Sequence, residues 1–178
     1  MYKEERERKQ IAAQATCIED YLKELEIQVE INTPENLHIP RVAQLTQKTN
    51  QFNLTTKRYT EDDIRGFLSA SQWEVWYLQL QDKIADMGIV GVTLVRYDGI
   101  TAEIDSFLLS CRALGRGAEE VFLNHVINSV QARGVKILKG EYIPTAKNKQ
   151  VADFYQQWRS CLLGVKFKKA YNQDARVD

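Results

Sequence analysis

A glycine-containing turn between a strand-like and a helix-like segment is the feature that most restricts the fold of this 178-residue chain. Arg112, Gly115 and Gly117 form the pattern R-x-x-G-x-G directly after an apolar run that ends near Ser110. Two glycines at this spacing let backbone N–H groups curl into a concave nest at a helix N-terminus, where unpaired donors and the helix dipole favour an anion. The pattern predicts a strand–nest–helix unit that binds a phosphate, with an ordinary glycine turn as the alternative.

The surrounding segments predict a mixed α/β domain. Residues 73–80 and 88–97 are apolar on both strand faces, as in central strands covered on both sides. The dipeptide Asp98-Gly99 indicates a hairpin into a further strand over 101–110. We therefore predict a mixed, mostly antiparallel sheet with helices on both faces. The remaining expected elements are helices over 3–26, 40–50, 118–134 and 148–159, a helix capped by Thr60, and strands over 26–31, 135–143 and 161–167.

Composition and charge argue against several classes of partner. Basic and acidic residues number 24 each, and this zero net charge argues against broad nucleic-acid or anionic-membrane binding. The longest apolar stretch, residues 89–95, is too short to span a bilayer, and residues 1–10 lack the apolar core of a signal peptide. Three scattered cysteines and two histidines predict neither disulfides nor a metal site. We expect a cytoplasmic protein.

The N-terminal segment carries a narrow apolar stripe. Ile11, Ala15, Ile18, Leu22 and Leu25 recur at steps of four and three, as in a coiled-coil seam. A helix with such a stripe packs against the core of its own chain, a neighbouring domain or a second subunit.

The nest and a second motif together resemble the GNAT acyltransferase family. The second motif is NKQVADFYQQW, in which Asn148 precedes Phe154 and Tyr155. In that family the R/Q-x-x-G-x-G/A loop holds a pyrophosphate, splayed central strands admit the pantetheine arm, and a tyrosine on the following helix protonates the departing thiolate. The resemblance implies splayed strands in this sheet and coenzyme A or phosphopantetheine as the acyl carrier.

Carried over position by position, the resemblance implies a carrier site around the nest. Tyr155 would be the general acid, which is chemically reasonable because phenol and alkyl thiol have neighbouring pKa values; a core aromatic beside Phe154 is the alternative. Asn148 would orient the pantetheine arm. The other residues implied to hold the carrier, of which the first three would act through main-chain hydrogen bonds, are Leu109, Ser110, Cys111, Arg112, Gly115, Arg116, Gly117 and Ala118.

Residues 42–64, 105–117 and 140–155 are similar to the C-terminal part of FkbH-like proteins. Members of that family combine a haloacid-dehalogenase-type phosphatase domain with a GNAT-like domain. They are associated with loading a glyceryl unit from a phosphoglycerate donor onto an acyl carrier protein for polyketide extender-unit synthesis. The sequence contains no D-x-D-x-T/V phosphatase motif. The resemblance implies two partners, an acyl carrier protein and a phosphatase domain absent from this chain, with residues 1–36 as the linker and residues 37–178 as the GNAT-like domain.

Several other residues are candidates for contact with the acyl group. Cys111 could be a nucleophile or a small buried cysteine, and Asp105 could be a general base or a polar strand residue. Glu141 and Thr145 lie where the thioester would emerge and could act as base or acyl contact. The amide-rich loop adds Asn50, Gln51 and Asn53, which suit a hydroxylated acyl group such as glyceryl or brace their own loop.

The leading prediction is therefore an acyltransferase that moves a small acyl group to or from a phosphopantetheine thioester. Two alternatives stay open. One is a non-catalytic module that keeps the GNAT fold and docks the carrier protein. The other is a free-standing acetyl-CoA-dependent N-acetyltransferase.

Overall fold

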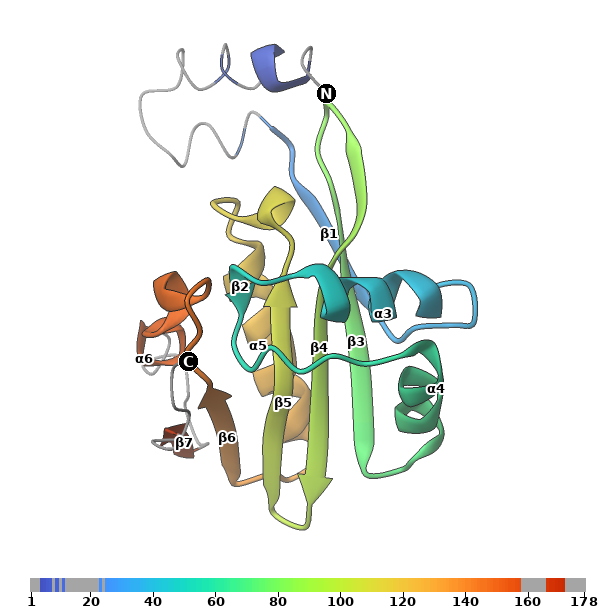
Figure 1. Cartoon of the computed structure of the whole chain (residues 1–178), viewed down its shortest axis with the longest axis vertical. Helices are drawn as coiled ribbons and strands as arrows, with labels where there is room; N and C mark the ends of the chain where they lie inside the picture. Colours follow the sequence, from blue (N-terminus) through green and yellow to red (C-terminus); the bar gives the residue numbers. More distant parts are fainter. Residues whose placement is uncertain are drawn as a thin grey trace.

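The computed structural model describes residues 4–7, 9, 11, 23, 25–157 and 166–171, and it forms one mixed sheet with helices on both faces (Figure 1). The seven-stranded sheet has the order β1-β3-β4-β5-β6-β7, and β2 pairs with β5. The strands are β1 (Gln28–Asn32), β2 (Phe52–Asn53), β3 (Trp73–Gln81), β4 (Asp86–Asp98), β5 (Thr101–Leu109), β6 (Ile137–Tyr142) and β7 (Lys166–Tyr171). The helices are α3 (Ile39–Lys48), α4 (Glu61–Ser69), α5 (Ala118–Ala132) and α6 (Phe154–Gln157), with 3-10 turns η1 (Cys111–Ala113) and η2 (Lys149–Val151).

The first part of the sheet is antiparallel, as predicted. β3 pairs with β4, and β4 pairs with β5 through a tight hairpin in which Gly99 has a φ of 58°. β1 pairs with the outer edge of β3 from Gln28 to Asn32. The strand that we grouped with the N-terminal linker is thus an edge strand of the domain's own sheet.

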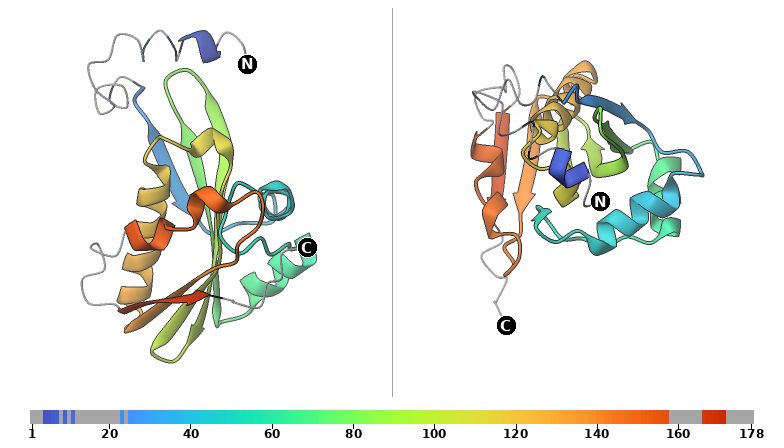
Figure 2. Two further views of the ribbon diagram at one scale, coloured as in Figure 1. Left: turned by 60° about the vertical axis from the view of Figure 1, so that its left-hand side comes forward. Right: turned by 90° about the horizontal axis from the view of Figure 1, so that it is seen from above.

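The apolar strands are covered on both faces because their alternating side chains enter two separate cores. From β3, Trp76 and Leu78 pack with α5 residues, whereas Val75 and Tyr77 pack with residues of α3 and α4. Figure 2 shows α5 on one side of the sheet and α3 and α4 on the other. This two-sided burial confirms the predicted architecture.

The strand–nest–helix–strand unit is also confirmed, and it produces the splay. After β5 the chain passes through η1 and α5 and returns as β6, which runs parallel to β5. The two strands pair only from Thr101–Ile137 to Ile104–Gly140. Beyond Ile104, β5 continues to Leu109 without β6 at its side.

Local signals explain the two helices on the α3/α4 face. Pro40 lies in the first turn of α3, where a missing N–H costs nothing. Thr60 and Asp63 form a capping box at the start of α4. The Asp63 carboxylate accepts hydrogen bonds from the backbone N–H and the hydroxyl of Thr60. These bonds lower the pKa of Asp63, and the bond from the backbone N–H has the larger effect.

The two ends of the chain differ from the prediction or lie outside the described residues. The continuous helix predicted over 148–159 is wrong in its described part, where η2 and α6 are separated by a turn at Ala152 and Asp153. The Asn148 amide donates to the carbonyls of Asn53 and Ile143 and does not cap a helix, and residues 158–159 lie outside the described residues. Of the last strand predicted over 161–167, residues 166 and 167 belong to β7, and residues 161–165 lie outside the described residues. Of the N-terminal helix predicted over 3–26, residues 4–7, 9, 11 and 23 are helical, and Leu25 is buried; the rest lies outside the described residues. In the described ranges no helix is both long and apolar enough to cross a membrane.

Candidate functional site

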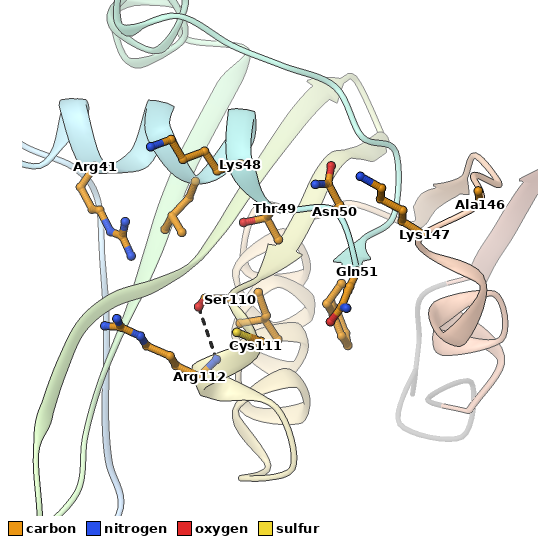
Figure 3. A pocket seen from close by; sticks show the side chains of 13 residues that line it. Arg41, Lys48, Thr49, Asn50, Gln51, Ser110, Cys111, Arg112, Ala146 and Lys147 are labelled. Atoms are coloured by element: carbon orange, nitrogen blue, oxygen red, sulfur yellow. Dashed lines mark hydrogen bonds between the residues drawn. The ribbon is translucent and has the colours of Figure 1, made fainter. Parts of the chain in front are cut away.

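A cavity of about 820 Å³ opens where α3 ends and β5 turns into η1 (Figure 3). Four of its lining side chains are cations, and none is acidic. The lining residues are Arg41, Leu45, Lys48, Thr49, Asn50, Gln51, Phe52, Leu109, Ser110, Cys111, Arg112, Ala146 and Lys147. A concave site with this charge favours an anionic ligand.

The four cations reach the cavity from three parts of the chain. Arg41 and Lys48 lie seven residues, about two helical turns, apart on α3, which brings them to one face. The Arg41 Nε donates to the Ile89 carbonyl at 3.2 Å. Burial and the positive charge of Arg112 lower the pKa of Arg41. Among the described residues, neither Lys48, Arg112 nor Lys147 is in an ion pair, so their charges are available to a ligand.

Cys111 lies among these cations at the start of η1. Its side chain is exposed, and its sulfur lies beside Ser110 at the wall of the cavity (Figure 3). The Ser110 hydroxyl accepts a hydrogen bond from the Arg112 N–H at 3.4 Å, which caps the turn. Cys111 was predicted to be either a nucleophile or a small buried cysteine, and its exposure contradicts the second alternative.

The glycine nest has the predicted geometry. Gly115 and Gly117 have φ values of 72° and 74°, a region that favours glycine, and nothing lies within 4 Å of the position of a Cβ at either residue. No carbonyl or side chain of the described chain accepts from the N–H groups of Gly115, Arg116 or Gly117. These open donors precede α5, which begins at Ala118. The main chain therefore offers an anion-binding concavity next to Arg112.

The side chain of Arg116 does not contribute to this concavity. Its Nη1 lies 2.8 Å from Oδ2 of Asp82, whose side chain is fully buried. The other Asp82 oxygen accepts from the N–H groups of Ile84 and Ala85. Arg116 was among the residues that the resemblance implied to hold the carrier, but its charge is paired with Asp82 in the turn between β3 and β4.

A second group of candidate residues lies along the middle of β5. Asp105 is an extra residue in the register between β4 and β5, because Leu94 pairs with Ser106 and Val95 pairs with Ile104. Such a bulge re-aims a side chain. The buried Asp105 carboxylate accepts from Lys57 Nζ at 2.8 Å, Tyr59 Oη at 2.6 Å and Ser106 Oγ at 2.9 Å.

Glu141 and Tyr155 belong to this second group, which we call the carboxylate cluster: Lys57, Tyr59, Asp105, Glu141 and Tyr155. Glu141 lies 3.9 Å from Lys57 Nζ. Tyr155 is 3% exposed in the core formed with Phe154. Burial, followed by the negative charges of Glu141 and Asp105, raises the pKa of Tyr155. Tyr155 does not line the cavity, so the structure does not place it beside Cys111.

β2 lies between the cavity and the carboxylate cluster. Phe52 pairs with Leu109 and Asn53 pairs with Leu108 on the edge of β5 that faces the splay. Main-chain bonds continue the pairing from the Leu54 N–H to the Phe107 carbonyl at 3.2 Å. The Ser110 N–H donates to the Val90 carbonyl at 2.7 Å. The main-chain contacts to pantetheine predicted for Leu109 and Ser110 are therefore contradicted, because other parts of the chain already pair with these groups.

Asn148 also has a different role from the predicted one. Its Nδ2 donates to the carbonyls of Asn53 and Ile143, at 2.9 Å each. Its Oδ1 accepts from the Thr145 N–H at 2.7 Å and the Tyr142 hydroxyl at 3.3 Å. Asn148 thus orients β2 rather than a carrier arm.

The residues predicted to contact the acyl group are divided by the same strand. Asn50 and Gln51 line the cavity. Asn53 is buried and braces its own loop through Thr49 and Thr56, whereas the Thr145 hydroxyl accepts from the Asn148 N–H. Asn53 therefore fits the alternative of a self-braced loop.

Sequence reasoning missed five residues of these two regions: Arg41, Lys48, Lys147, Lys57 and Tyr59. The seven-residue spacing of Arg41 and Lys48 on a predicted helix was a usable signal for one basic face. Lys57 and Tyr59 had no such signal, because their partner Asp105 is more than 40 residues away. In the part of the chain that the structure describes, no group of His, Cys, Asp and Glu side chains could hold a metal ion.

Comparison with known proteins identifies the architecture. No protein-family model matches the sequence, and neither does any curated protein. Among solved structures, an acetyltransferase of the GNAT family from Staphylococcus aureus matches 75% of this chain and 82% of its own, with a TM-score of 0.53 and 11% identity. The chain has the GNAT fold.

Two further structures share this fold. The ribosomal-protein-S18-alanine N-acetyltransferase from Escherichia coli matches with a TM-score of 0.53 and 17% identity, over 73% of this chain and 76% of its own. AAC(6')-Iy, in complex with a bisubstrate analogue of coenzyme A, matches with a TM-score of 0.54 and 12% identity, over 85% of this chain and 95% of its own.

Proposed function

We propose that this domain is an acyltransferase that carries a small acyl group on the Cys111 thiol and exchanges it with a phosphopantetheine thioester. The observation that carries the proposal is an exposed thiol in a cavity that four cations line and no acid enters. The GNAT fold supports acyl transfer as the class of reaction, and AAC(6')-Iy binds its coenzyme A analogue on the same fold.

The exchange balances without a further reactant. The Cys111 sulfur attacks the thioester carbonyl, a new C–S bond forms, and the C–S bond to the carrier breaks. The carrier thiol leaves with the proton that Cys111 releases through solvent. Because one thioester replaces another, the step is reversible, and the nearby cations stabilise the negative charge that develops on the carbonyl oxygen.

The cavity fits the phosphate and thiol ends of such a substrate. Lys48, Arg112 and Lys147 supply unpaired positive charge inside the cavity. The N–H groups at Gly115 and Gly117 do not line the cavity; they follow Arg112 in the chain and would supply further donors for phosphate oxygens at its edge. The gap between β5 and β6 does not fit a pantetheine arm, because β2 fills it. We therefore place the thioester in the cavity and not between the strands.

The finer assignment rests on the resemblance to FkbH-like proteins. We propose glyceryl or a similar hydroxylated three-carbon acid as the acyl group, because Asn50 and Gln51 present amides to the cavity. An acyl carrier protein in the cytoplasm would present the phosphopantetheine, and a phosphatase domain would pack against the N-terminal segment. Light scattering of the chain alone, together with a measurement of the burial of its N-terminal helix, tests the packing of a phosphatase domain against that helix. A monomer in which the helix is already buried would contradict it.

Intact mass spectrometry tests the proposed reaction. The chain is incubated with glyceryl-loaded carrier protein, and we expect a mass increase of one glyceryl unit on the wild type and none on Cys111→Ala. Cys17→Ser and Cys161→Ser, at the two other cysteines of the sequence, control for non-specific thiol acylation and should keep the adduct.

The same experiment separates the alternatives. A docking module would bind the carrier protein without forming an adduct on any cysteine. An N-acetyltransferase would transfer the acetyl group of acetyl-CoA to an amine as fast in Cys111→Ala as in the wild type. Either result would overturn the proposed role of Cys111.

A further inference from the structure

β2 and the residues after it occupy the place between the splayed strands. On one side, the Leu54 N–H donates to the Phe107 carbonyl of β5 at 3.2 Å. On the other side, the Leu54 carbonyl accepts from the Ile143 N–H, just past β6, at 2.8 Å. A short stretch of this chain thus bridges both arms of the splay, as an added strand does.

The side chains of this stretch are part of the hydrophobic core. Phe52 and Leu54 are buried in the core on the α5 face. The Phe52 ring lies 5.1 Å from the ring of Phe154 and 6.2 Å from that of Phe107, measured between centroids. Withdrawal of the stretch would expose both side chains to water, which opposes its release.

Polar contacts fix the stretch at both ends. Asn148 is fully buried and holds the Asn53 carbonyl through its Nδ2, while its Oδ1 is held by Thr145. After Leu54, the Thr55 hydroxyl donates to the Asp105 carbonyl at 2.9 Å. A group as thoroughly satisfied as Asn148 rigidifies its neighbours.

We infer that Phe52–Thr55 is a built-in strand that permanently takes the place of an extended pantetheine arm, with Asn148 as its positioning residue. The splay of this GNAT fold is therefore closed to free coenzyme A. A thioester reaches the domain only from the open side of β2, at Cys111. The direction of approach rests on the proposed function, whereas the permanence of the strand does not.

Residue-resolved hydrogen exchange of the wild-type chain tests the permanence. The reporters are the amides of Leu54 and Ile143, and the reference is the Ser110 amide, which lies just past the end of β5 and donates to Val90 in β4. If the strand is permanent, its amides become exposed only when the sheet itself opens. We therefore expect the exchange rates of Leu54 and Ile143 to lie within about tenfold of the rate of Ser110. Reporters that exchange through a local opening, more than about tenfold faster than Ser110, would overturn the inference.

Coenzyme A supplies the second arm of the experiment. At millimolar coenzyme A the exchange rates of Leu54 and Ile143 should stay unchanged or fall. Acceleration of both amides would mean that the arm expels β2, and the inference would be wrong. The proposed function fails if no adduct forms on Cys111. That outcome leaves the exchange rates of Leu54 and Ile143 unchanged, so the two failures can be told apart.

Substitution of Asn148 tests its positioning role. Asn148→Ala removes the hydrogen bonds to Asn53 and Ile143, and we expect Leu54 and Ile143 to exchange at least about tenfold faster relative to Ser110. Gln51→Ala is the matched control, since Gln51 is an exposed amide in the same segment and should leave the ratio unchanged. Equal ratios of reporter to reference exchange rates in Asn148→Ala and the wild type would contradict the positioning role of Asn148. If the variant does not fold, the wild-type measurement still decides whether the strand is permanent.

Discussion

The cationic cavity and the carboxylate cluster lie on opposite sides of β2. The cations of the cavity are largely unpaired within the described chain, whereas the central carboxylate of the cluster is fully bonded. In the cavity, Lys48, Arg112 and Lys147 are without ion pairs among the described residues, and Cys111 is exposed. In the cluster, the Asp105 carboxylate is buried and holds three donors. Removal of one member of a buried, paired set leaves its partners uncompensated and destabilises the fold, whereas unpaired charges that line a cavity can bind a ligand. Both regions carry chemically suitable residues, but the central carboxylate of the cluster is buried and already bonded, whereas the thiol of the cavity is exposed.

The cluster should therefore be the more important region for stability. Asp105→Ala leaves Lys57 and Tyr59 without their carboxylate, and we expect the free energy of unfolding to fall by about 3 kcal/mol. Glu103→Ala is the matched control on the same strand, because Glu103 pairs with Arg96 at the surface, and it should cost less than about 1 kcal/mol. Denaturant unfolding measures both. Similar losses in the two variants would mean that the cluster is not the structural region.

The cavity should be the more important region for binding. Arg112→Ala removes one unpaired cation, and we expect coenzyme A to bind about tenfold more weakly, an effect of about 1.4 kcal/mol. The free energy of unfolding should change by less than about 0.5 kcal/mol, as at an exposed site. Calorimetric titration measures the affinity, with Lys149→Ala, an exposed lysine outside the cavity, as the control. If both variants bound coenzyme A equally weakly, the effect would come from the overall charge of the protein and not from the position of Arg112 in the cavity.

The smallest expected effect concerns Tyr155 at alkaline pH. Burial raises its pKa in the folded state above the value of about 10 in the unfolded chain, so its contribution is fully present below pH 10 and is lost as the pH rises further. Between pH 9 and 10.5 the wild type should lose about 0.8 kcal/mol through this residue, a loss that Tyr155→Phe lacks. Unfolding curves at the two pH values measure the difference. Equal losses in both proteins would show that Tyr155 is accessible, and the contrast between the regions would weaken.

Local sequence signals accounted for most of the fold. The nest was predictable because its glycines, the preceding strand and the following helix are contiguous in the sequence. The covered strands were predictable because their side chains are apolar on both faces. The exposure of Cys111 and the pairing of Arg116 were not predictable, because they depend on where separate loops pack.

The position of β2 decided the organisation of the site, and no local signal predicts it. The amide-rich loop was expected to contact the acyl group or to brace itself, yet Asn53 also accepts a hydrogen bond from Asn148, which is 95 residues away in the sequence. Two residues are too few for strand periodicity to show. The same long-range pairing explains why Asn148, Tyr155 and the nest form a single site in the family resemblance and two regions in this structure.

The rate of acyl transfer in two single variants decides whether Cys111 or Tyr155 carries the reaction. Glyceryl-loaded carrier protein is the donor, and the adduct on the chain is followed by mass spectrometry against time. We predict no adduct in Cys111→Ala and a rate within about threefold of the wild type in Tyr155→Phe, because the latter loses only a hydroxyl on the far side of β2. A Tyr155→Phe variant that fails to transfer while Cys111→Ala remains active would contradict this prediction.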